Sequence, residues 1–198
     1  AAEFLVPDVR LLGVPLNYKD ISGIDKVYSS VSGYRLPNNV EKLFLTNRAA
    51  RGLGNTQDNE ITGYSANNWL YGDGGDDKLF GQSGDDFLSV GHGSSEVDGG
   101  RGIDTFSYLM RTGETAVLSN TQFGAVANNK NVASVKLSGI EKARITGNRG
   151  DDSFEVNGSI STVFYGLNGN DSARGGDGDD TFFGGNGHDA LIGNSGSD

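Results

Sequence analysis

The chain contains no cysteine, only 3 prolines and a single tryptophan among its 198 residues. Without cysteine, neither disulfides nor thiolate metal sites can stabilise the fold. Hydrophobic residues make up 35% of the chain, below the roughly 45–50% that is usual even though that range also counts glycine. No apolar run approaches the about 18 residues that indicate a transmembrane helix. The composition therefore argues against a disulfide-rich domain, a conventional layered globule and a membrane span.

Basic residues are also few, since 16 Lys and Arg stand against 26 Asp and Glu and give a formal net charge of −10. Phosphate binding needs clustered Lys and Arg, so this balance argues against nucleic acid as a partner. An acidic surface can serve solubility alone. Here, however, the Asp residues recur at a fixed spacing, which favours cations as partners.

Glycine, by contrast, is abundant, with 32 residues in the chain. Many of them follow a nine-residue period of the form G-G-x-G-x-D-x-U-x, in which U is usually a large apolar residue. Good matches begin at Gly72, Gly81, Gly99, Gly147, Gly166, Gly175 and Gly184. A fixed short period predicts a solenoid of stacked repeats. Because nine residues are too few to go round a coil, we expect two repeats to complete one turn.

The apolar position of the repeat predicts the core. The eighth residue of each nine is Ile61, Leu70, Leu79, Leu88, Val97 and Phe106 in the first block, and Ala173, Phe182 and Leu191 in the second. Helical periodicity is nearly absent. We therefore expect an all-β fold, a right-handed parallel β-roll or β-solenoid with two blocks of nonapeptide repeats and intervening strand segments.

The organisation along the chain suggests three parts. Residues 1–23 form a leader or a cloning-derived segment, 24–107 a first β-roll module, and 108–198 a second β-roll module truncated within a repeat. The segments VEKLFLT (Val40–Thr46) and IEKARIT (Ile140–Thr146) echo each other, and each leads into repeats. Residues 107–146 break the period with strand-like TAVLSN and SVKLSG. Because the chain stops after six residues of a repeat, GNSGSD, we expect it to be a fragment of a longer polypeptide.

The sixth residue of each repeat is the candidate metal ligand. These residues are Asp77, Asp86, Asp104, Asp152, Asp171, Asp180 and Asp189, with Asp198 a conditional ligand because no strand follows it. Stacked turns would combine their carboxylates with glycine-turn carbonyl oxygens. A hard, all-oxygen site without His or Cys suits several Ca²⁺ ions better than Mg²⁺, which demands tight octahedral geometry.

The spacing predicts which acids share a site. Pairs 18 residues apart are Asp86 with Asp104, Asp171 with Asp189, and Asp180 with Asp198, while Asp152 and Asp171 are 19 apart. Asp77 faces Asn59 and Ser95, so its site should be weaker. Asn59 and Asn68 should form neutral hydrogen-bonding ladders, and the second block should hold more ions. Without Ca²⁺, the repelling carboxylates, the thin core and the Gly-rich chain predict a largely disordered state.

These nonapeptides resemble those of the RTX (repeats-in-toxin) family. The lead-in from SGIDKVYSSVSGYRLPNNVEKLFLT to GNTQDNEITGYSANNWLYG is also similar to the family. The resemblance implies a calcium-bound parallel β-roll. It also implies a secreted Gram-negative bacterial protein exported by a type I secretion system and folded by calcium outside the cell or at its surface. The Asn and Ser residues at ligand positions in the first block, and the interruption at 107–146, depart from the family pattern.

Three other interpretations compete with this one. One is a purely structural repeat without metal, in which Asn and Asp ladders cap the turns. Recurring DD pairs argue against catalysis in this chain, because catalysis needs one unique site; the parent protein could still be a hydrolase, lyase or epimerase with this chain as an accessory module. Alternatively, the chain is a stalk or glycan-binding part of an RTX adhesin or surface-layer protein, with Tyr64, Trp69 and Tyr71 as an aromatic platform. His92 and His188 fall at variable turn positions and should be solvent-exposed spectators.

Overall fold

The computed structural model describes residues 3–6, 23–128 and 130–198, in which the regular elements are all β-strands. The segment 1–23, expected to be a leader or a cloning-derived piece, lies largely outside these residues; within it, Glu3–Val6 forms β1. No helix in the described part of the chain is long and apolar enough to cross a membrane. The predicted all-β fold is confirmed.

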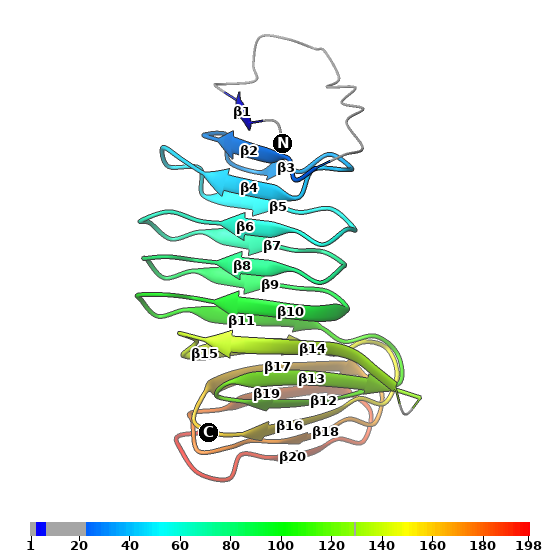
Figure 1. The fold of residues 1–198 in the computed structure, drawn as a ribbon. Helices are drawn as coiled ribbons and strands as arrows, with labels where there is room; N and C mark the ends of the chain where they lie inside the picture. The colour runs from blue at the N-terminus through cyan, green and yellow to red at the C-terminus, as the bar shows by residue number, and fades with distance from the viewer. Residues whose placement is uncertain (1–2, 7–22, 129) are drawn as a thin grey trace.

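The strands stack into two sheets that face each other along a solenoid, with turns on both sides (Figure 1). One sheet has 12 strands in the order β1 (Glu3–Val6), β2 (Lys26–Ser29), β4 (Lys42–Leu45), β6 (Glu60–Thr62), β8 (Lys78–Phe80), β10 (Gly93–Asp98), β14 (Lys130–Ser138), β13 (Gln122–Ala127), β12 (Glu114–Ser119), β16 (Ser153–Asn157), β18 (Ser172–Arg174) and β20 (Ala190–Ile192). The other has 8 strands in the order β19 (Thr181–Asn186), β17 (Ser161–Asn168), β15 (Lys142–Thr146), β11 (Thr105–Leu109), β9 (Phe87–Ser89), β7 (Trp69–Tyr71), β5 (Arg51–Leu53) and β3 (Tyr34–Arg35).

The register follows the repeat. In the first block Glu60 pairs with Lys78 and Lys78 with Glu96, so parallel neighbours are 18 residues apart. In the second block Ser153 pairs with Ser172, 19 residues on, because the intervening repeat has one extra residue. Each nonapeptide thus supplies half a coil, as predicted, and same-phase residues of alternate repeats lie one above the other.

The interruption between the two blocks is an inserted meander. β12, β13 and β14 all enter the 12-stranded sheet, and β13 runs antiparallel to both neighbours. In the 8-stranded sheet β11 pairs directly with β15, so this sheet passes over the insertion without interruption. The two blocks therefore share both sheets. That 24–107 and 108–198 fold as separate modules stays a prediction.

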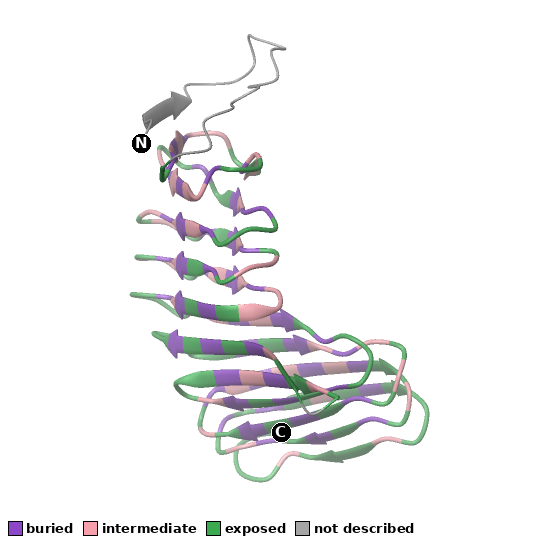
Figure 2. Cartoon of the chain, turned by 45° about the vertical axis from the view of Figure 1, so that its right-hand side comes forward, coloured by how far each residue is buried: buried purple, intermediate pink, exposed green. Residues whose placement is uncertain are grey.

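The core is a narrow strip between the sheets, and buried and exposed residues alternate along the strands (Figure 2). All six predicted apolar residues of the first block, from Ile61 to Phe106, have 0% exposure. In the second block Ala173 is buried and Phe182 is partly buried, but Leu191 in the last coil is 38% exposed. The inserted β13 adds Phe123, whose ring centroid lies 4.6 Å from that of Tyr108.

Candidate metal centre

The sixth residues of the repeats line up in two columns of turns, one leading into each sheet (Figure 1). We call them the first turn ladder, which leads into the 12-stranded sheet, and the second turn ladder, which leads into the 8-stranded sheet. The first contains Asn59, Asp77, Ser95, Asp152, Asp171 and Asp189, and the second contains Asn68, Asp86, Asp104, Asp180 and Asp198. All eight predicted aspartates thus belong to these two columns.

Backbone hydrogen bonds join the rungs of each ladder. The N–H of Asp86 donates to Oδ1 of Asp104 at 2.8 Å. The same bond, at 2.9 Å, joins Asp152 to Asp171, Asp171 to Asp189, and Asp180 to Asp198. The structure therefore brings together each of the four aspartate pairs that the spacing predicted.

Most of these carboxylates are buried. Asp77 and Asp104 are 0% exposed, and Asp86, Asp152, Asp171 and Asp180 are at most 2% exposed. Within the described residues, Oδ2 has no hydrogen-bond partner in Asp77, Asp86, Asp104 and Asp171. In Asp152 and Asp180, Oδ2 instead accepts the backbone N–H of Asn148 and Gly176. Asp189 is half-buried and Asp198 exposed, since they lie in the last coil.

A carbonyl oxygen lies beside three of the four unpartnered carboxylate oxygens, those of Asp86, Asp104 and Asp171. At Gly81, an added Cβ would stand closer than 3.0 Å to Oδ2 of Asp86 and to the carbonyl oxygen of Gly99, one coil further on. Gly166 has the same surroundings, made by Asp171 and the carbonyl oxygen of Gly184. Only glycine leaves room there. The turns therefore form cradles lined by oxygen atoms, which fit a hard cation such as Ca²⁺.

Burial raises the pKa of the Asp77 carboxyl from 3.8 to about 7, with neighbouring aspartates adding to the rise and a hydrogen bond from Asn59 opposing it. Burial likewise raises the pKa of Asp86 to about 7, and Asp104 contributes repulsion. The pKa values of Asp104, Asp152, Asp171 and Asp180 are also raised, mainly by burial. Ionised carboxylates at these depths therefore require a compensating positive charge.

The side-chain amides of the two asparagine rungs have all their hydrogen-bonding atoms paired with backbone groups. Oδ1 of Asn68 accepts the N–H of Tyr64 at 2.7 Å, and its Nδ2 donates to the carbonyl of Ala49 at 3.4 Å. Asn59 does the same through its Nδ2, which donates to the carbonyl of Val40 at 3.3 Å. The amide group thus places a donor beside a carbonyl of the preceding coil. The predicted neutral hydrogen-bonding ladder is confirmed at both positions.

A second set of acids was missed in the sequence analysis. The exposed fifth residues accept backbone N–H groups of the next coil: the N–H of Asp76 donates to Asp58 at 2.8 Å, and the N–H of Ser94 to Asp76 at 2.7 Å. These bonds run opposite to those of the sixth residues. The DD pairs were the available signal, because they place an acid at both phases. The same acceptor role falls to Asp85, Asp151 and Asp179.

The two histidines differ. His188 is exposed, as expected. The expectation was wrong for His92, whose Nε2 lies 2.5 Å from Oε1 of the buried Glu114 and whose ring stacks on Tyr108. The inserted meander supplies Glu114, so the sequence around the turn could not reveal this contact.

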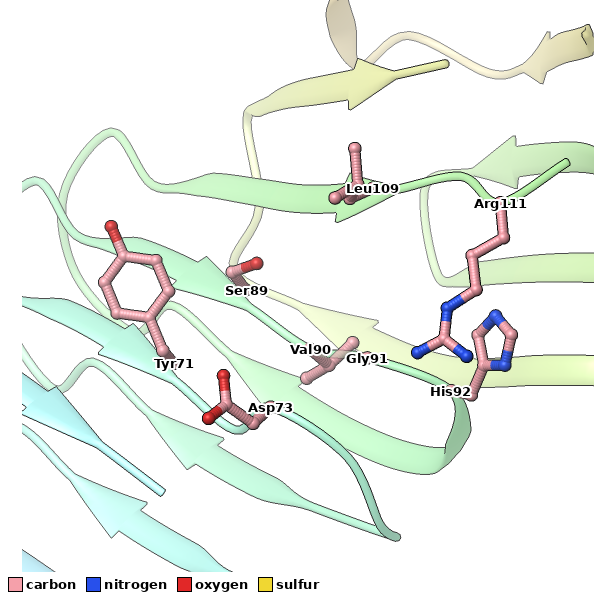
Figure 3. A pocket seen from close by; sticks show the side chains of 8 residues that line it. All are labelled: Tyr71, Asp73, Ser89, Val90, Gly91, His92, Leu109 and Arg111. Atoms are coloured by element: carbon pink, nitrogen blue, oxygen red, sulfur yellow. The ribbon is translucent and has the colours of Figure 1, made fainter. Parts of the chain in front are cut away.

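The aromatic platform is only partly as proposed. Trp69 is 52% exposed on the 8-stranded sheet, with its ring centroid 5.8 Å from that of Phe87, and Tyr71 lies 5.9 Å from Phe87. Tyr64 instead packs against the core. Beside Tyr71 opens a cavity of about 210 Å³. Figure 3 shows its lining, with Tyr71 and Asp73 at one end and His92 and Arg111 at the other.

Comparison with protein families agrees with this geometry. A family model for the RTX calcium-binding nonapeptide repeat matches the chain in 4 copies, over residues 53–88 and 165–198. The chain carries RTX calcium-binding repeats. The matched segments contain six of the eight candidate ligands and leave out Asp104 and Asp152. A search of curated proteins found no match.

In the described residues no group of three or more His, Cys, Asp or Glu side chains comes together as a metal site. A cation in the turns would therefore depend on backbone carbonyl oxygens as well as on one or two carboxylates. This is the donor set that the RTX-type glycine turns present at Gly81 and Gly166.

Proposed function

We propose that this chain is a calcium-binding module of a large secreted bacterial protein, disordered without Ca²⁺ and folded by Ca²⁺ outside the cell. The observation that carries the proposal is the pair of turn ladders. In these ladders, each of four buried aspartates has a carboxylate oxygen without a hydrogen-bond partner among the described residues. This oxygen lies next to a turn glycine, whose missing side chain leaves the space open. The RTX repeats matched over 53–88 and 165–198 support calcium as the cation.

The ligand set follows from the ladders. Bound Ca²⁺ would supply the positive charge and the coordination that the carboxylate and carbonyl oxygens lack. Side-chain ligands would be Asp77, Asp86, Asp104, Asp152, Asp171, Asp180, Asp189 and Asp198, with glycine-turn carbonyls completing each site. The glycines admit these oxygens, and the Oδ1 hydrogen bonds hold the carboxylates in place in the folded chain.

Folding and binding are coupled in this arrangement. Without a cation, like charges meet at each pair of rungs, and the Gly-rich turns lose much conformational freedom on ordering. Extracellular calcium modules bind at about 10⁻⁴–10⁻³ M. The chain would therefore stay unfolded in the cytosol, pass through a type I secretion system, and fold outside. We assign no catalysis to it; the parent could be a hydrolase, lyase or epimerase.

Far-UV circular dichroism of the metal-free chain during a Ca²⁺ titration, with Mg²⁺ as the control, tests this proposal. The expected result is a cooperative gain of β-sheet signal near millimolar Ca²⁺ that Mg²⁺ does not produce. A chain that is fully folded after dialysis against EDTA and insensitive to Ca²⁺ would overturn it.

A second candidate function is carbohydrate binding, as in a stalk or adhesin. The half-exposed Trp69 lies next to Phe87 and Tyr71, and the adjoining cavity adds Asp73 and Arg111. Apolar rings beside a few polar groups are the usual make-up of a small-molecule site. A glycan array on the calcium-loaded chain tests it: Trp69→Ala should abolish any binding, whereas Phe183→Ala, which removes another ring half-exposed on the same sheet, should not.

A further inference from the structure

Glu141 continues the second turn ladder across the interruption between the blocks. It stands directly before β15, and its Oε2 accepts the N–H of Asp104 at 2.9 Å. Asp104 has the same relation to Asp86, whose N–H it accepts at 2.8 Å. Because β11 pairs directly with β15, a glutamate 37 residues further along the chain occupies the rung that an aspartate would fill in a regular repeat.

Asp104 has an oxygen turned into this junction without a partner. The residue is 0% exposed, Oδ1 is used by Asp86, and Oδ2 has no hydrogen-bond partner in the described part of the chain. A Cβ added to Gly99 would stand closer than 3.0 Å to both this Oδ2 and the carbonyl oxygen of Gly139. Two oxygens, one from the first block and one from the segment that returns from the meander, thus face the same small space.

The charge at the junction is negative. Three acidic side chains, those of Glu141, Asp85 and Asp98, lie close enough to Asp104 to repel its carboxylate. Carboxylate and carbonyl oxygens in a negatively charged setting are ligands for a hard divalent cation. A junction of this kind calls for a positive charge on the same grounds as the regular turns do.

We propose that Asp104, Glu141 and the carbonyl of Gly139 bind a divalent cation that fastens the first repeat block to the second. The inference rests on the proposed calcium-binding function and extends it to a site outside the matched repeats, which end at residue 88 and resume at 165. Neither half of the site is complete alone, because β11 supplies one side and the segment returning from the meander supplies the other.

The chain contains a matched control. Glu41, in the echoing VEK segment, accepts the N–H of Asp25 at 2.8 Å just as Glu141 accepts that of Asp104. Its neighbouring carbonyl, that of Val40, already receives the Asn59 amide at 3.3 Å. The next rung after Glu41 is the neutral Asn59. Glu41 therefore makes the same hydrogen bond as Glu141 at a position where we expect no cation.

The experiment counts ions on the full chain by native mass spectrometry in saturating Ca²⁺, measures the melting temperature in Ca²⁺, and compares the far-UV circular dichroism in EDTA. Glu141→Gln keeps an acceptor for the Asp104 N–H but removes the charge. We expect it to bind one ion fewer and to melt at a lower temperature in Ca²⁺, with an unchanged spectrum in EDTA. Glu41→Gln should keep the wild-type ion count.

An unchanged ion count and unchanged calcium-dependent melting in Glu141→Gln would overturn the inference, while the wild-type count would still support calcium binding by the repeats. A wild-type chain that binds no Ca²⁺ would instead overturn the proposed function. If Glu141→Gln does not fold, Glu141→Asp decides. This variant keeps the charge on a shorter side chain and should weaken binding of the junction ion by about tenfold or more. An unchanged affinity for that ion would contradict the site.

Discussion

The coil that carries Asn68 and the coil that carries Asp86 share one backbone plan and differ in a single group at the ladder position. In the first, Nδ2 of Asn68 donates to the carbonyl of Ala49. In the second, the corresponding atom of Asp86 is Oδ1, which accepts the N–H of Asn68 at 2.6 Å. Its Oδ2 lies beside Gly81 as Oδ1 of Asn68 lies beside Gly63, and it has no partner among the described residues. With an amide, the turn satisfies the polar groups of its ladder residue; with a carboxylate, it leaves one oxygen for which we propose an external cation. The chain thus begins its regular repeats with neutral rungs and continues them with charged ones.

The largest expected effect comes from filling the cradles. Gly81→Ala would place a Cβ against Asp86 and the Gly99 carbonyl, and Gly63→Ala would do so against Asn68 and the Gly81 carbonyl. Each should cost about 3 kcal/mol of unfolding free energy in urea titrations with Ca²⁺, but only Gly81→Ala should also lose an ion. Gly74→Ala, which meets nothing within 4 Å, is the control. A tolerated Gly81→Ala would contradict the cradle.

Exchanging the amide and carboxylate side chains at Asn68 and Asp86 should change the stability of the metal-free chain in opposite directions. Asn68→Asp buries an acid next to Asp86 and should destabilise the metal-free chain by about 1–3 kcal/mol, whereas Asp86→Asn should stabilise it by about 1 kcal/mol and bind fewer ions. Denaturant titrations of the dialysed, metal-free proteins, folded by an osmolyte such as TMAO, measure both effects. Equal and same-signed changes from the two variants would argue against the amide as a substitute for the cation.

The pH dependence should reverse with calcium. Burial raises the pKa of Asp77 and Asp86 to about 7 in the metal-free fold. A carboxyl with a higher pKa folded than unfolded stabilises the fold at low pH, and this contribution is lost as the pH rises from about 4 to about 7. The metal-free chain should therefore show more β-sheet signal in far-UV circular dichroism at pH 5 than at pH 8. With Ca²⁺ it should melt lower at pH 5, because protons compete for the ligands. Parallel trends in the two series would refute this.

The smallest effect is expected at the exposed aspartates in the fifth position of the repeats. Asp85→Ala removes the acceptor for the Ile103 N–H, a bond of 2.9 Å, and should cost about 1 kcal/mol, while Asp85→Asn keeps an acceptor and should cost less. Thermal melts in Ca²⁺ measure the difference, and ion counts should not change in either variant. Loss of an ion in Asp85→Asn would place the fifth residue among the ligands.

The regular repeats were predictable because period, core and ligand phase are all local properties of nine residues. The position of each residue within the repeat was enough to predict that Leu79 is buried and that Asp77 lies in a turn ladder. The meander was only half predictable: TAVLSN and SVKLSG indicated β12 and β14, but β13 (QFGAVA) was missed, although Phe123 and Ala125 alternate with less buried neighbours.

Contacts across the meander could not be predicted at all from the repeat. Glu141 contacts Asp104, and Glu114 contacts His92, because the inserted meander separates β11 from its sheet partner β15 along the chain. The pairing distances of 37 and 22 residues fit no multiple of the repeat. The physical reason is that a meander adds strands to one sheet only, so its register depends on packing around residues such as Tyr108 and Phe123 and not on a local period.

Hydrogen exchange read by mass spectrometry, with and without Ca²⁺, tests the central contrast most directly. We predict that removal of Ca²⁺ deprotects β16, β18, β19 and β20, which follow ladder aspartates, more than β6 and β7, which follow ladder asparagines. Restoring millimolar Ca²⁺, but not Mg²⁺, should bring the protection back. Equal protection of both regions with and without the ion would contradict the claim that the carboxylate ladders need a cation to fold.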